Sequence, residues 1–359
     1  MQPDVLIMPG RGRRVTRTTL YDLTLDELRT RVTELGQQPF RASQIYDWAY
    51  KKLATGYDEM SNVPAALRTS LLETLPMDPL TQMHVVETDD GETVKFLYTT
   101  HDAQLVETVL MFYPDRATVC VSCQVGCAVG CAFCATGLGG LQRNLTAGEM
   151  VVQAVNAARI ARDRGRPLTN LVMMGMGEPF HNYRETMKFI GILNDKHGLE
   201  FGARRITVST SGIVPGIQKL AEEPYQVNLA ISLHAPNDEL RSSLVPINDR
   251  FPVNVLMQTA RDYIARTGRR ISFEYALMKG INDSDEVAGQ LADLLQGMLC
   301  HVNIIPLNPV DVLPYERPDT ADIERFAAVL ERRGIPTTVR YSRGVEIAAA
   351  CGQLRAKFQ

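Results

Sequence analysis

The sequence predicts an α/β protein whose core is a partial (βα)6 TIM-like barrel, preceded by a small helical domain. Short β-rich runs alternate with helical stretches from about residue 146 to residue 341. Parallel strands need crossover connections of this length, so the alternation predicts a parallel sheet covered by helices. About six strand–helix repeats suit an open barrel better than a doubly wound sheet, a choice that periodicity alone leaves open.

The N-terminal part of the chain predicts a flexible arm followed by helices. Residues 1–20 show no regular apolar pattern and form the arm, whereas 21–76 form the helical domain. Thr24 and Glu27 provide a capping box for a first helix, which Gly36 ends. Further helices are predicted near 42–52 and 64–75. Strand-like runs at 93–99 and 105–113 make 77–117 a β-rich extension.

The barrel is predicted to span residues 118–345, and residues 346–359 form a C-terminal segment. Later strands are expected near 170–174, 205–209, 227–233, 271–277, 302–306 and 337–341. The carboxyl ends of parallel strands form one face of such a fold, where a site is usually built. A single pocket is expected there, because polar residues follow several of these strands: Gly177, Glu178, Ser209, His234 and Asn308.

The chain has the composition of an ordinary globular protein, with 45% hydrophobic residues and a net charge of −3. This charge gives no global basic footprint, so composition alone leaves nucleic-acid binding undecided. No apolar run is long enough to span a bilayer, and the N-terminal residues lack the apolar stretch of a secretory signal. We therefore expect a cytoplasmic protein without a membrane partner.

Cysteine spacing is the most informative local feature. Five of the seven cysteines fall within residues 120–134, and an odd count argues against a disulfide framework. Cys127-x3-Cys131-x2-Cys134 places three thiolates where they can wrap one cubane and leave the fourth iron without a protein ligand. An open iron of this kind can bind S-adenosylmethionine. The spacing therefore predicts one [4Fe–4S] cluster with S-adenosylmethionine as cosubstrate.

A zinc site is the alternative interpretation of the same loop. Cys120-x2-Cys123 and Cys131-x2-Cys134 can be read as two zinc knuckles. However, only seven residues separate the two pairs, and Cys127 would be left over. The spacing favours the iron–sulfur cluster.

Motifs along nearly the whole chain accompany this loop. They are F-R-A-S-Q-I-Y-D-W at 40–48, C-V-S-C-Q-V-G-C at 120–127, C-A-T-G at 134–137, R-N-L-T at 143–146, M-G-M-G-E-P at 174–179, S-T-S-G at 209–212, S-L-H-A-P-N-D at 232–238, V-P-I-N at 245–248, I-P-L-N-P at 305–309 and A-C-G-Q-L at 350–354. With the cluster loop they closely resemble the RlmN family of RNA adenine-C2 methyltransferases in the radical S-adenosylmethionine superfamily. The resemblance runs from about Leu23 to Leu354.

The resemblance implies both a substrate and a mechanism. The substrate is an adenine in the peptidyl-transferase loop of 23S rRNA, with the purine beside the anticodon of tRNA as a second target. One S-adenosylmethionine methylates Cys351, and a second, bound to the cluster, yields a 5′-deoxyadenosyl radical that activates this methyl group. Cys120 then releases the methylated RNA by forming a disulfide with Cys351. A flavodoxin- or ferredoxin-like reductant, a thioredoxin-like reductant and a monomeric enzyme are expected.

The resemblance also assigns the remaining site residues. Glu107 is implied as the proton acceptor for the RNA adduct; without that context it would be an outward-facing strand carboxylate. Without their motifs, Cys120 and Cys351 would be small buried side chains. The implied contacts to S-adenosylmethionine are Gly177, Glu178, Ser209, Ser232, Leu233, His234 and Asn308.

Two features stay open at the level of sequence. The helical domain carries basic and aromatic side chains that suit RNA, although Trp48 suits helix packing equally. These side chains are Arg41, Lys51, Lys52, Tyr46, Trp48 and Tyr50. Cys123 stands where the family commonly has serine, and it can pair with Cys120, ligate the cluster or be tolerated, the last being our expectation.

Two other functions remain as alternatives. Methylation of the same rRNA adenine at C8 belongs to the phenicol-resistance branch of the family; M-G-M-G-E-P and the developed N-terminal domain favour C2. A non-catalytic zinc-containing RNA-binding module is the alternative from a different class.

Overall fold

The computed structural model describes residues 18–354, which contain one large sheet of ten strands. The strands lie side by side in the order β1-β2-β3-β4-β7-β8-β9-β10-β11-β12. Their bounds are Leu80–Glu87 (β1), Thr93–Thr100 (β2), Leu105–Tyr113 (β3), Arg116–Cys120 (β4), Leu168–Met173 (β7), Ile206–Thr210 (β8), Asn228–Ser232 (β9), Ile271–Leu277 (β10), Cys300–Pro306 (β11) and Thr337–Val339 (β12). From β4 to β12 neighbouring strands are parallel, whereas β1 to β4 form antiparallel pairs.

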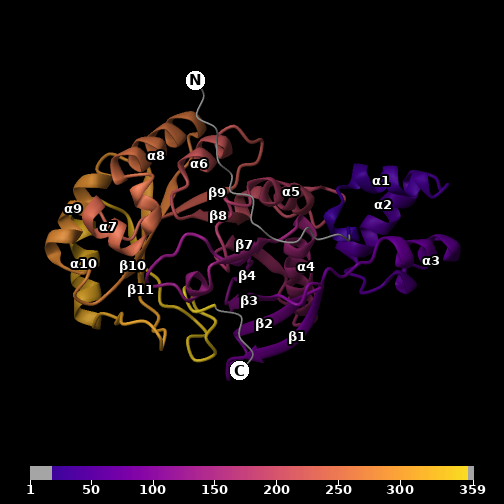
Figure 1. Cartoon of the computed structure of the whole chain (residues 1–359), viewed down its shortest axis with the longest axis horizontal. Helices are drawn as coiled ribbons and strands as arrows, with labels where there is room; N and C mark the ends of the chain where they lie inside the picture. Colours follow the sequence, from indigo (N-terminus) through magenta and orange to yellow (C-terminus); the bar gives the residue numbers. More distant parts are fainter. Residues whose placement is uncertain (1–17, 355–359) are drawn as a thin grey trace.

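Six strand–helix units build the parallel part, and the predicted partial (βα)6 barrel is confirmed. The helices are Ala147–Asp163 (α4), Tyr183–Asn194 (α5), Val214–Leu220 (α6), Asp238–Leu244 (α7), Val253–Thr267 (α8), Asp285–Leu295 (α9) and Thr320–Arg332 (α10). Figure 1 shows most of them in an arc along the outer side of the curved sheet. In the described sheet β1 and β12 lie at opposite ends of the strand order, so the barrel is open.

The β-rich extension continues the sheet beyond β4. The predicted runs at 93–99 and 105–113 correspond to β2 and β3. The sequence gives no signal for β1, because its residues 81–84 are all exposed and a β-bulge lies between Gln82 and His84. A bulged edge strand of this kind lacks the alternation by which strands are recognised.

The N-terminal helical unit packs against α4 (Figure 1). It contains α1 (Leu25–Glu34), α2 (Phe40–Tyr46), a π-helical turn over Asp47–Lys51 and α3 (Ala65–Thr74). The predicted capping box is present, with Thr24 Oγ1 accepting from Glu27 N–H at 3.3 Å. Arg159 of α4 joins the units: its guanidinium donates to the carbonyls of Leu53 and Ala54. Most of the predicted arm lies outside the described residues, but Leu20 is fully buried.

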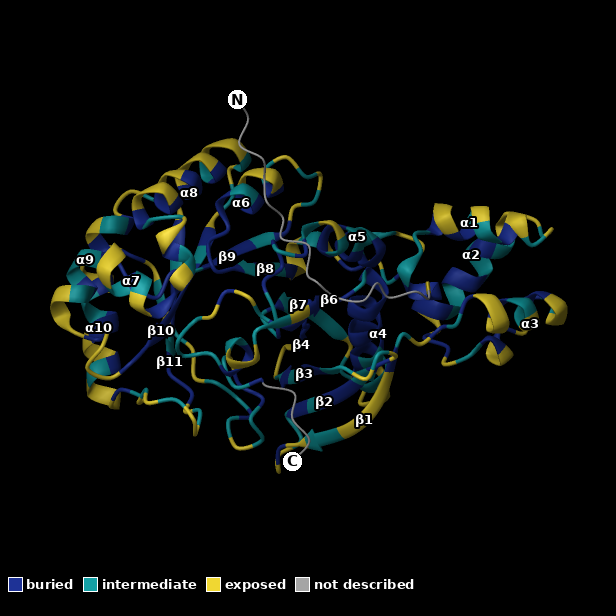
Figure 2. Ribbon diagram, viewed as in Figure 1, coloured by how far each residue is buried: buried dark blue, intermediate teal, exposed yellow. Residues whose placement is uncertain are grey.

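One apolar core runs through the helical unit and the barrel. In Figure 2 the inner faces of the helices and the sheet between them are buried, and the outer helix faces are exposed. This one-sided burial is the pattern expected for helices that cover a sheet. None of the described helices is long and apolar enough to cross a membrane.

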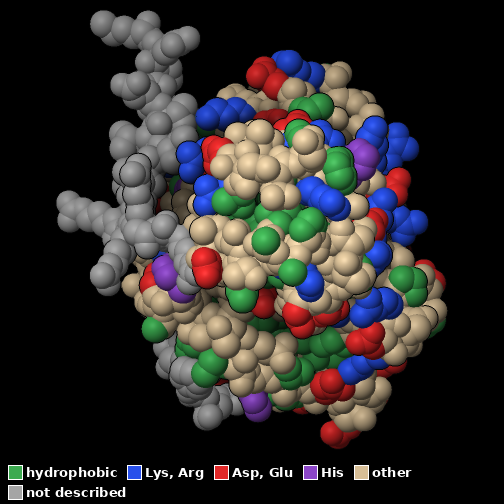
Figure 3. All heavy atoms as spheres, turned by 90° about the vertical axis from the view of Figure 1, so that its right-hand side faces the viewer, with side chains coloured by type: hydrophobic (Ala, Val, Ile, Leu, Met, Phe, Trp, Pro, Cys, Tyr) green, Lys and Arg blue, Asp and Glu red, His purple; other side chains and the backbone are tan. Residues whose placement is uncertain are grey.

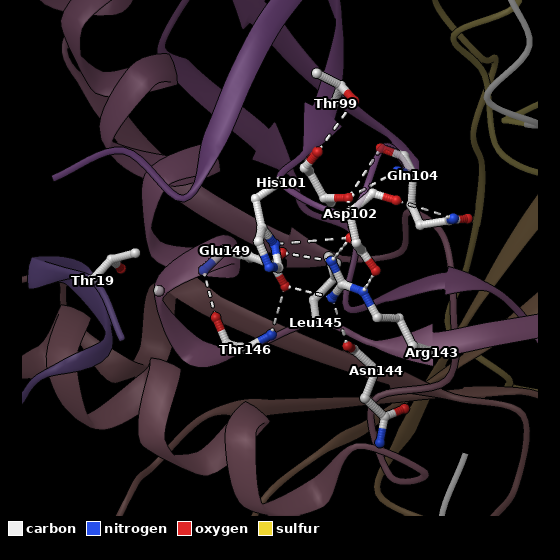
Figure 4. A network of polar contacts seen from close by, with 12 residues as sticks. Thr19, Thr99, His101, Asp102, Gln104, Arg143, Asn144, Leu145, Thr146 and Glu149 are labelled. Atoms are coloured by element: carbon white, nitrogen blue, oxygen red, sulfur yellow. Dashed lines mark hydrogen bonds and ion pairs between the residues drawn. The ribbon is translucent and has the colours of Figure 1, made fainter. Parts of the chain in front are cut away.

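Arg143, in the R-N-L-T motif, fastens the β-rich extension to the barrel (Figure 4). Its guanidinium donates to Asp102, in the β2–β3 turn, at 2.8 Å from both Nε and Nη2. It also donates to both carboxylate oxygens of Glu149, at the start of α4, at 2.8 Å. Because Arg143 and Glu149 are buried, this bidentate pairing fixes where the extension lies.

Candidate active site

The three predicted cluster cysteines lie on a loop closed by backbone hydrogen bonds. The loop follows β5 (Gln124–Gly126), which pairs with β6 (Leu141–Asn144) in a small second sheet. Cys127 N–H donates to the Gly140 carbonyl at 3.1 Å. Gly126 has a φ of +74°, and a Cβ there would collide with the same carbonyl, so this position requires glycine.

Cys127, Cys131 and Cys134 line one cavity of about 170 Å³, which we call the cluster cavity. Burial raises the pKa of Cys127 to about 12 and raises the pKa of Cys131 well above its ordinary value. Such thiols become thiolates only beside a cation, a condition that bound iron supplies. The described residues contain no three His, Cys, Asp or Glu side chains placed for a single ion. Each thiolate of a cubane ligates a different iron, so this donor set fits a cluster.

The cluster cavity lies at the carboxyl ends of the parallel strands, where the sequence predicted one pocket. Leu233 is the exception among the predicted cosubstrate contacts. Its side chain is fully buried away from the cavity wall, and its N–H donates to the Glu274 carbonyl at 3.0 Å. The other predicted contacts line the cavity together: Gly177, Glu178, Ser209, Ser232, His234 and Asn308.

Glu178 is a buried carboxylate whose position is fixed by hydrogen bonds. Ser211 donates to its Oε2 from N–H at 2.7 Å and from Oγ at 2.8 Å, and Phe180 N–H donates to Oε1 at 3.0 Å. Glu178 N–H in turn donates to Gln124 Oε1 at 2.8 Å. A carboxylate has about four acceptor positions, so an ammonium group in the cavity still finds a partner here.

His234 is held as a neutral imidazole in the left-handed region of backbone space. Its φ is +62°, which is uncommon for a residue with a side chain. Burial is the main cause, and the charge of Arg241 the second, that together lower its pKa to about 3. Nδ1 accepts a hydrogen bond from Ala276 N–H at 2.9 Å, so in the neutral ring Nε2 carries the proton. His234 therefore offers the cavity one fixed N–H donor.

The C-terminal segment that carries Cys351 is bonded directly to the cluster loop. Ala135 N–H donates to the Gly352 carbonyl at 2.8 Å, and Thr136 Oγ1 donates to the Leu354 carbonyl at 2.6 Å. Asn308 Nδ2 donates to the Cys351 carbonyl at 3.0 Å. These bonds place Cys351 in the wall of the cluster cavity, together with the three cluster cysteines, which lie far from it in the sequence.

Cys351 also lines a second cavity of about 580 Å³. We call it the arginine cavity, because Arg116, Arg340 and Arg343 lie in its wall. Cys120 lines it as well, and the presence of Cys351 contributes to raising the pKa of the Cys120 thiol, after burial. Ala349 and Leu354, on either side of Cys351, pack in one apolar cluster with Cys120. The two cysteines are thus neighbours, and both are free thiols.

Glu107 lies on β3, outside the walls of both cavities. The carboxylate is buried, with Oε1 3.3 Å from Lys95 Nζ. Lys95 also donates to the Ala348 carbonyl at 3.4 Å, which connects Glu107 to the segment carrying Cys351. The alternative of an outward-facing carboxylate is therefore wrong, since β3 is covered on this face.

The sequence patterns did not indicate two residues that line or support the cavities. Glu274 of β10 lines both cavities, and an acid within the apolar run I-S-F-E-Y-A-L was the available signal. Arg241 of α7 is fully buried and donates to the carbonyls of Ser211, Ser232 and Leu233. Its charge therefore sits behind the strand ends that form the cluster cavity. No periodicity distinguishes it from an exposed helix arginine.

The helical unit offers fewer RNA-stacking side chains than the sequence suggested. Tyr46 and Tyr50 are buried, with ring centroids 4.5 Å apart, so the expectation that they stack bases is wrong. Trp48 donates from Nε1 to Asn62 at 2.6 Å and lies under Lys52 Nζ at 3.6 Å from the ring centroid. Figure 3 shows basic and acidic side chains interspersed over the face that includes this unit.

Comparison with known proteins agrees with this geometry. Residues 121–291 match the radical SAM superfamily, and residues 18–76 match the ribosomal RNA large subunit methyltransferase N-terminal domain. A probable dual-specificity RNA methyltransferase RlmN from Geobacillus kaustophilus is 46% identical over 98% of both chains. The Bacillus subtilis relative of the same name is 46% identical over 96% of this chain and 94% of its own length.

The chain belongs to the RlmN family. A crystal structure of a radical SAM methyltransferase from Sphaerobacter thermophilus has 62% sequence identity and a TM-score of 0.94 over 95% of this chain and all of that one. The protein is therefore a radical SAM RNA methyltransferase of the RlmN family, which uses a [4Fe–4S] cluster and S-adenosylmethionine. The predicted resemblance and cofactors are confirmed, and the zinc-module alternative falls away.

Proposed function

We propose that this enzyme methylates C2 of an adenine in the peptidyl-transferase loop of 23S rRNA and the purine beside the anticodon of tRNA, with Cys351 as methyl carrier. One observation carries the proposal: the segment of Cys351 is bonded to the cluster loop, and its thiol lines both cavities. A methyl carrier must meet its methyl donor on one side and RNA on the other.

The cluster cavity is the proposed site of S-adenosylmethionine. Cys127, Cys131 and Cys134 would hold a [4Fe–4S] cluster, which when bound would supply an open coordination site and an electron for cleavage of the cosubstrate. Glu178 accepts from the ammonium group of the methionine moiety, and His234 donates from Nε2. The remaining proposed contacts are Gly177, Ser209, Ser232 and Asn308, with Leu233 acting only as packing behind the wall.

The roles of the other residues follow from their positions. Cys351 takes the methyl group as a thiolate nucleophile and then carries the carbon that adds to the adenine. Cys120 resolves the resulting thioether by forming a disulfide with Cys351, which its packing against Ala349 and Leu354 and its place in the arginine cavity support. Glu107 accepts the proton that C2 loses, and its link through Lys95 to Ala348 supports this role.

RNA would approach through the arginine cavity. Its wall combines Arg116, Arg340 and Arg343 with Tyr113 and Tyr341, and Tyr341 is 58% exposed. Guanidinium groups hold phosphates, and aromatic faces stack unpaired bases. The target adenine must leave its stack to reach Cys351. We therefore place the main RNA contact at the arginine cavity and not at the helical unit.

The chemistry requires two electron donors. Reductive cleavage of S-adenosylmethionine consumes one electron, for which we propose a flavodoxin- or ferredoxin-like protein. A Cys120–Cys351 disulfide must be reduced between turnovers, for which we propose a thioredoxin-like protein. We further propose that the enzyme acts as a monomer in the cytoplasm, where its RNA substrates are made.

Cysteine variants test the carrier role. Cys120→Ala should accumulate a covalent RNA–protein adduct, because the thioether can no longer be resolved, and Cys351→Ala should prevent methyl transfer to the protein. Cys300→Ala is the matched control, since Cys300 is buried at the start of β11, and should retain activity within about twofold. Normal RNA methylation by Cys351→Ala would exclude the carrier mechanism.

The position of the methyl group needs a separate measurement. Mass spectrometry of nucleosides from rRNA and tRNA treated with the enzyme should give 2-methyladenosine in both. A product that coelutes with 8-methyladenosine would replace C2 by the C8 alternative, and product in rRNA alone would remove tRNA as a substrate.

A further inference from the structure

Glu274 is a buried carboxyl group with one oxygen that no other described residue satisfies. The residue is 4% exposed, and Asn303 Nδ2 donates to its Oε1 at 2.8 Å. Oε2 has no hydrogen-bond partner among residues 18–354. A buried acceptor without a partner loses its hydration without compensation, so its presence calls for a ligand or a chemical role.

Glu274 lies in the wall that separates the two cavities. Among the described residues, four side chains line both cavities: Met174, Glu274, Ile305 and Cys351. Of these four, the two that can exchange a proton are Glu274 and Cys351. Glu274, which carries the unsatisfied oxygen, is therefore on the same cavity walls as the proposed methyl carrier.

The charges around the two groups also couple them. The pKa of Cys351, a residue that keeps an exposed surface, is raised to about 11, first by desolvation of the thiol and next by the Glu274 carboxylate. Burial raises the pKa of Glu274, while Arg340 and Asn303 oppose that shift. The negative charges of the Glu274 carboxylate and the Cys351 thiolate repel each other. The pair therefore retains one shared proton more readily than it loses both.

We propose that Glu274 accepts the proton of Cys351 as this thiol takes a methyl group from S-adenosylmethionine. The S–H bond of Cys351 breaks, its proton goes to Oε2, and the sulfur electron pair forms the new carbon–sulfur bond. The bond between methyl and sulfonium breaks, and its electrons stay on the departing S-adenosylhomocysteine. No oxidant or reductant is needed. The inference rests on the proposed role of Cys351 as methyl carrier.

The step removes charge beside the buried Glu274. A carboxylate and a sulfonium cation disappear, and a neutral carboxyl group, a thioether and a neutral leaving group remain. Surroundings that disfavour an ionised Glu274 also favour this product. Arg340, the cation that influences both groups, keeps the carboxylate available before the cosubstrate binds.

Glu274→Gln provides the test, because the amide keeps the shape of the side chain but cannot take a proton. Reconstituted holoprotein with unmethylated Cys351 is mixed with S-adenosylmethionine labelled in its methyl group, and protein methylation is followed by mass spectrometry between pH 6 and 9. The wild type should react at a rate nearly independent of pH. The variant should be at least about tenfold slower at pH 7 and recover as the pH rises.

The rate at which iodoacetamide alkylates Cys351 without cosubstrate distinguishes a proton acceptor from a residue that only holds the segment in place. At pH 9, where solvent base can take the thiol proton, Glu274→Gln should be alkylated at least as fast as the wild type, because it lacks the charge that raises the thiol pKa. Glu274→Asp, which keeps a carboxylate, should keep the pH-independent methylation profile. Glu331→Gln, an exposed carboxylate on α10, is the matched control and should match the wild type in both assays.

The outcomes separate this inference from the proposed function. Wild-type methylation rates in Glu274→Gln would overturn the inference and leave the carrier role intact. A parallel fall of methylation and alkylation that persists at pH 9 would also overturn it, since Glu274 would then only hold the segment in place. If wild-type Cys351 acquires no methyl group, the carrier role fails and this inference fails with it.

Discussion

At the scale of single residues, His234 shows how burial selects one chemical form. Its ring lies 4.8 Å from that of Phe133, edge to face, and Nδ1 is occupied by the Ala276 N–H. A protonated ring would lose that acceptor and place a charge beside the buried Arg241. Only the neutral tautomer with Nε2–H satisfies these contacts.

The depressed pKa of His234 predicts a loss of stability in acid. The folded-state pKa is about 3, below the ordinary value of 6.5, so the unfolded chain binds a proton that the folded chain does not over this interval. The free energy of unfolding should therefore fall as the pH falls from about 6.5 towards 3, by up to about 1.4 kcal/mol per pH unit from this residue.

Urea unfolding at several pH values measures this contribution as a difference between variants. His234→Asn keeps an acceptor for Ala276 N–H but does not titrate, so its stability should depend less steeply on pH. Equal slopes for the wild type and the variant would show that His234 does not remain neutral in the fold.

Cys123 is a second residue whose role is decided by burial. It is 2% exposed within the main apolar core, and burial raises its pKa well above the ordinary value. A thiol in such a place is a small apolar side chain. This environment favours the expectation that Cys123 is tolerated, over a role as cluster ligand.

We predict that Cys123→Ala leaves the cluster intact. Removing one buried sulfur should cost about 1 kcal/mol of stability, and RNA methylation should stay within about twofold. Iron content and the visible absorbance of the anaerobic protein check this. A variant with markedly less iron per chain would instead identify Cys123 as a ligand.

At the scale of elements, long-range ion pairs decide how the β-rich extension meets the barrel. Arg143 holds both the β2–β3 turn and the start of α4, and it lowers the pKa of Asp102 to about 2. The sequence identified both elements, but R-N-L-T gave no indication of their contact. Elements follow from local patterns, whereas the partner of an ion pair depends on the fold.

Arg143→Met should strongly destabilise the protein, by about 3–5 kcal/mol, because it leaves the buried Glu149 without its cation. Asp102→Asn should cost clearly less, since the side chain of Asp102 is 21% exposed and Glu149 keeps its partner. Urea unfolding of both variants gives the comparison. The reverse order would mean that the turn contact, and not the buried pair, dominates.

At the scale of the whole molecule, the helical unit and the barrel share one core. Apolar residues of both belong to a single cluster, and Arg159 donates to two carbonyls of the helical unit. The domain boundaries read from the sequence stay predictions. Shared burial makes independent unfolding of the N-terminal unit unfavourable.

We therefore predict one cooperative unfolding transition. The chain has one tryptophan, Trp48, whose fluorescence reports the helical unit, while cluster absorbance reports the barrel. Both signals should change at the same midpoint in the wild type, and Arg159→Met should lower both midpoints together. An earlier change in fluorescence alone would show that the helical unit unfolds separately.

The sequence by itself determined what depends on short spacings: the alternation of strands and helices, the capping box at Thr24, and the loop with Cys127, Cys131 and Cys134. The order of the motifs along the chain indicated the family and, with it, the cofactors. Only the tertiary structure decided which distant residues meet, including Cys351 beside the cluster loop and near Cys120, and Glu274 between the two cavities. The reason is physical: backbone geometry and periodicity act over a few residues, whereas burial and contact are set by how whole elements pack.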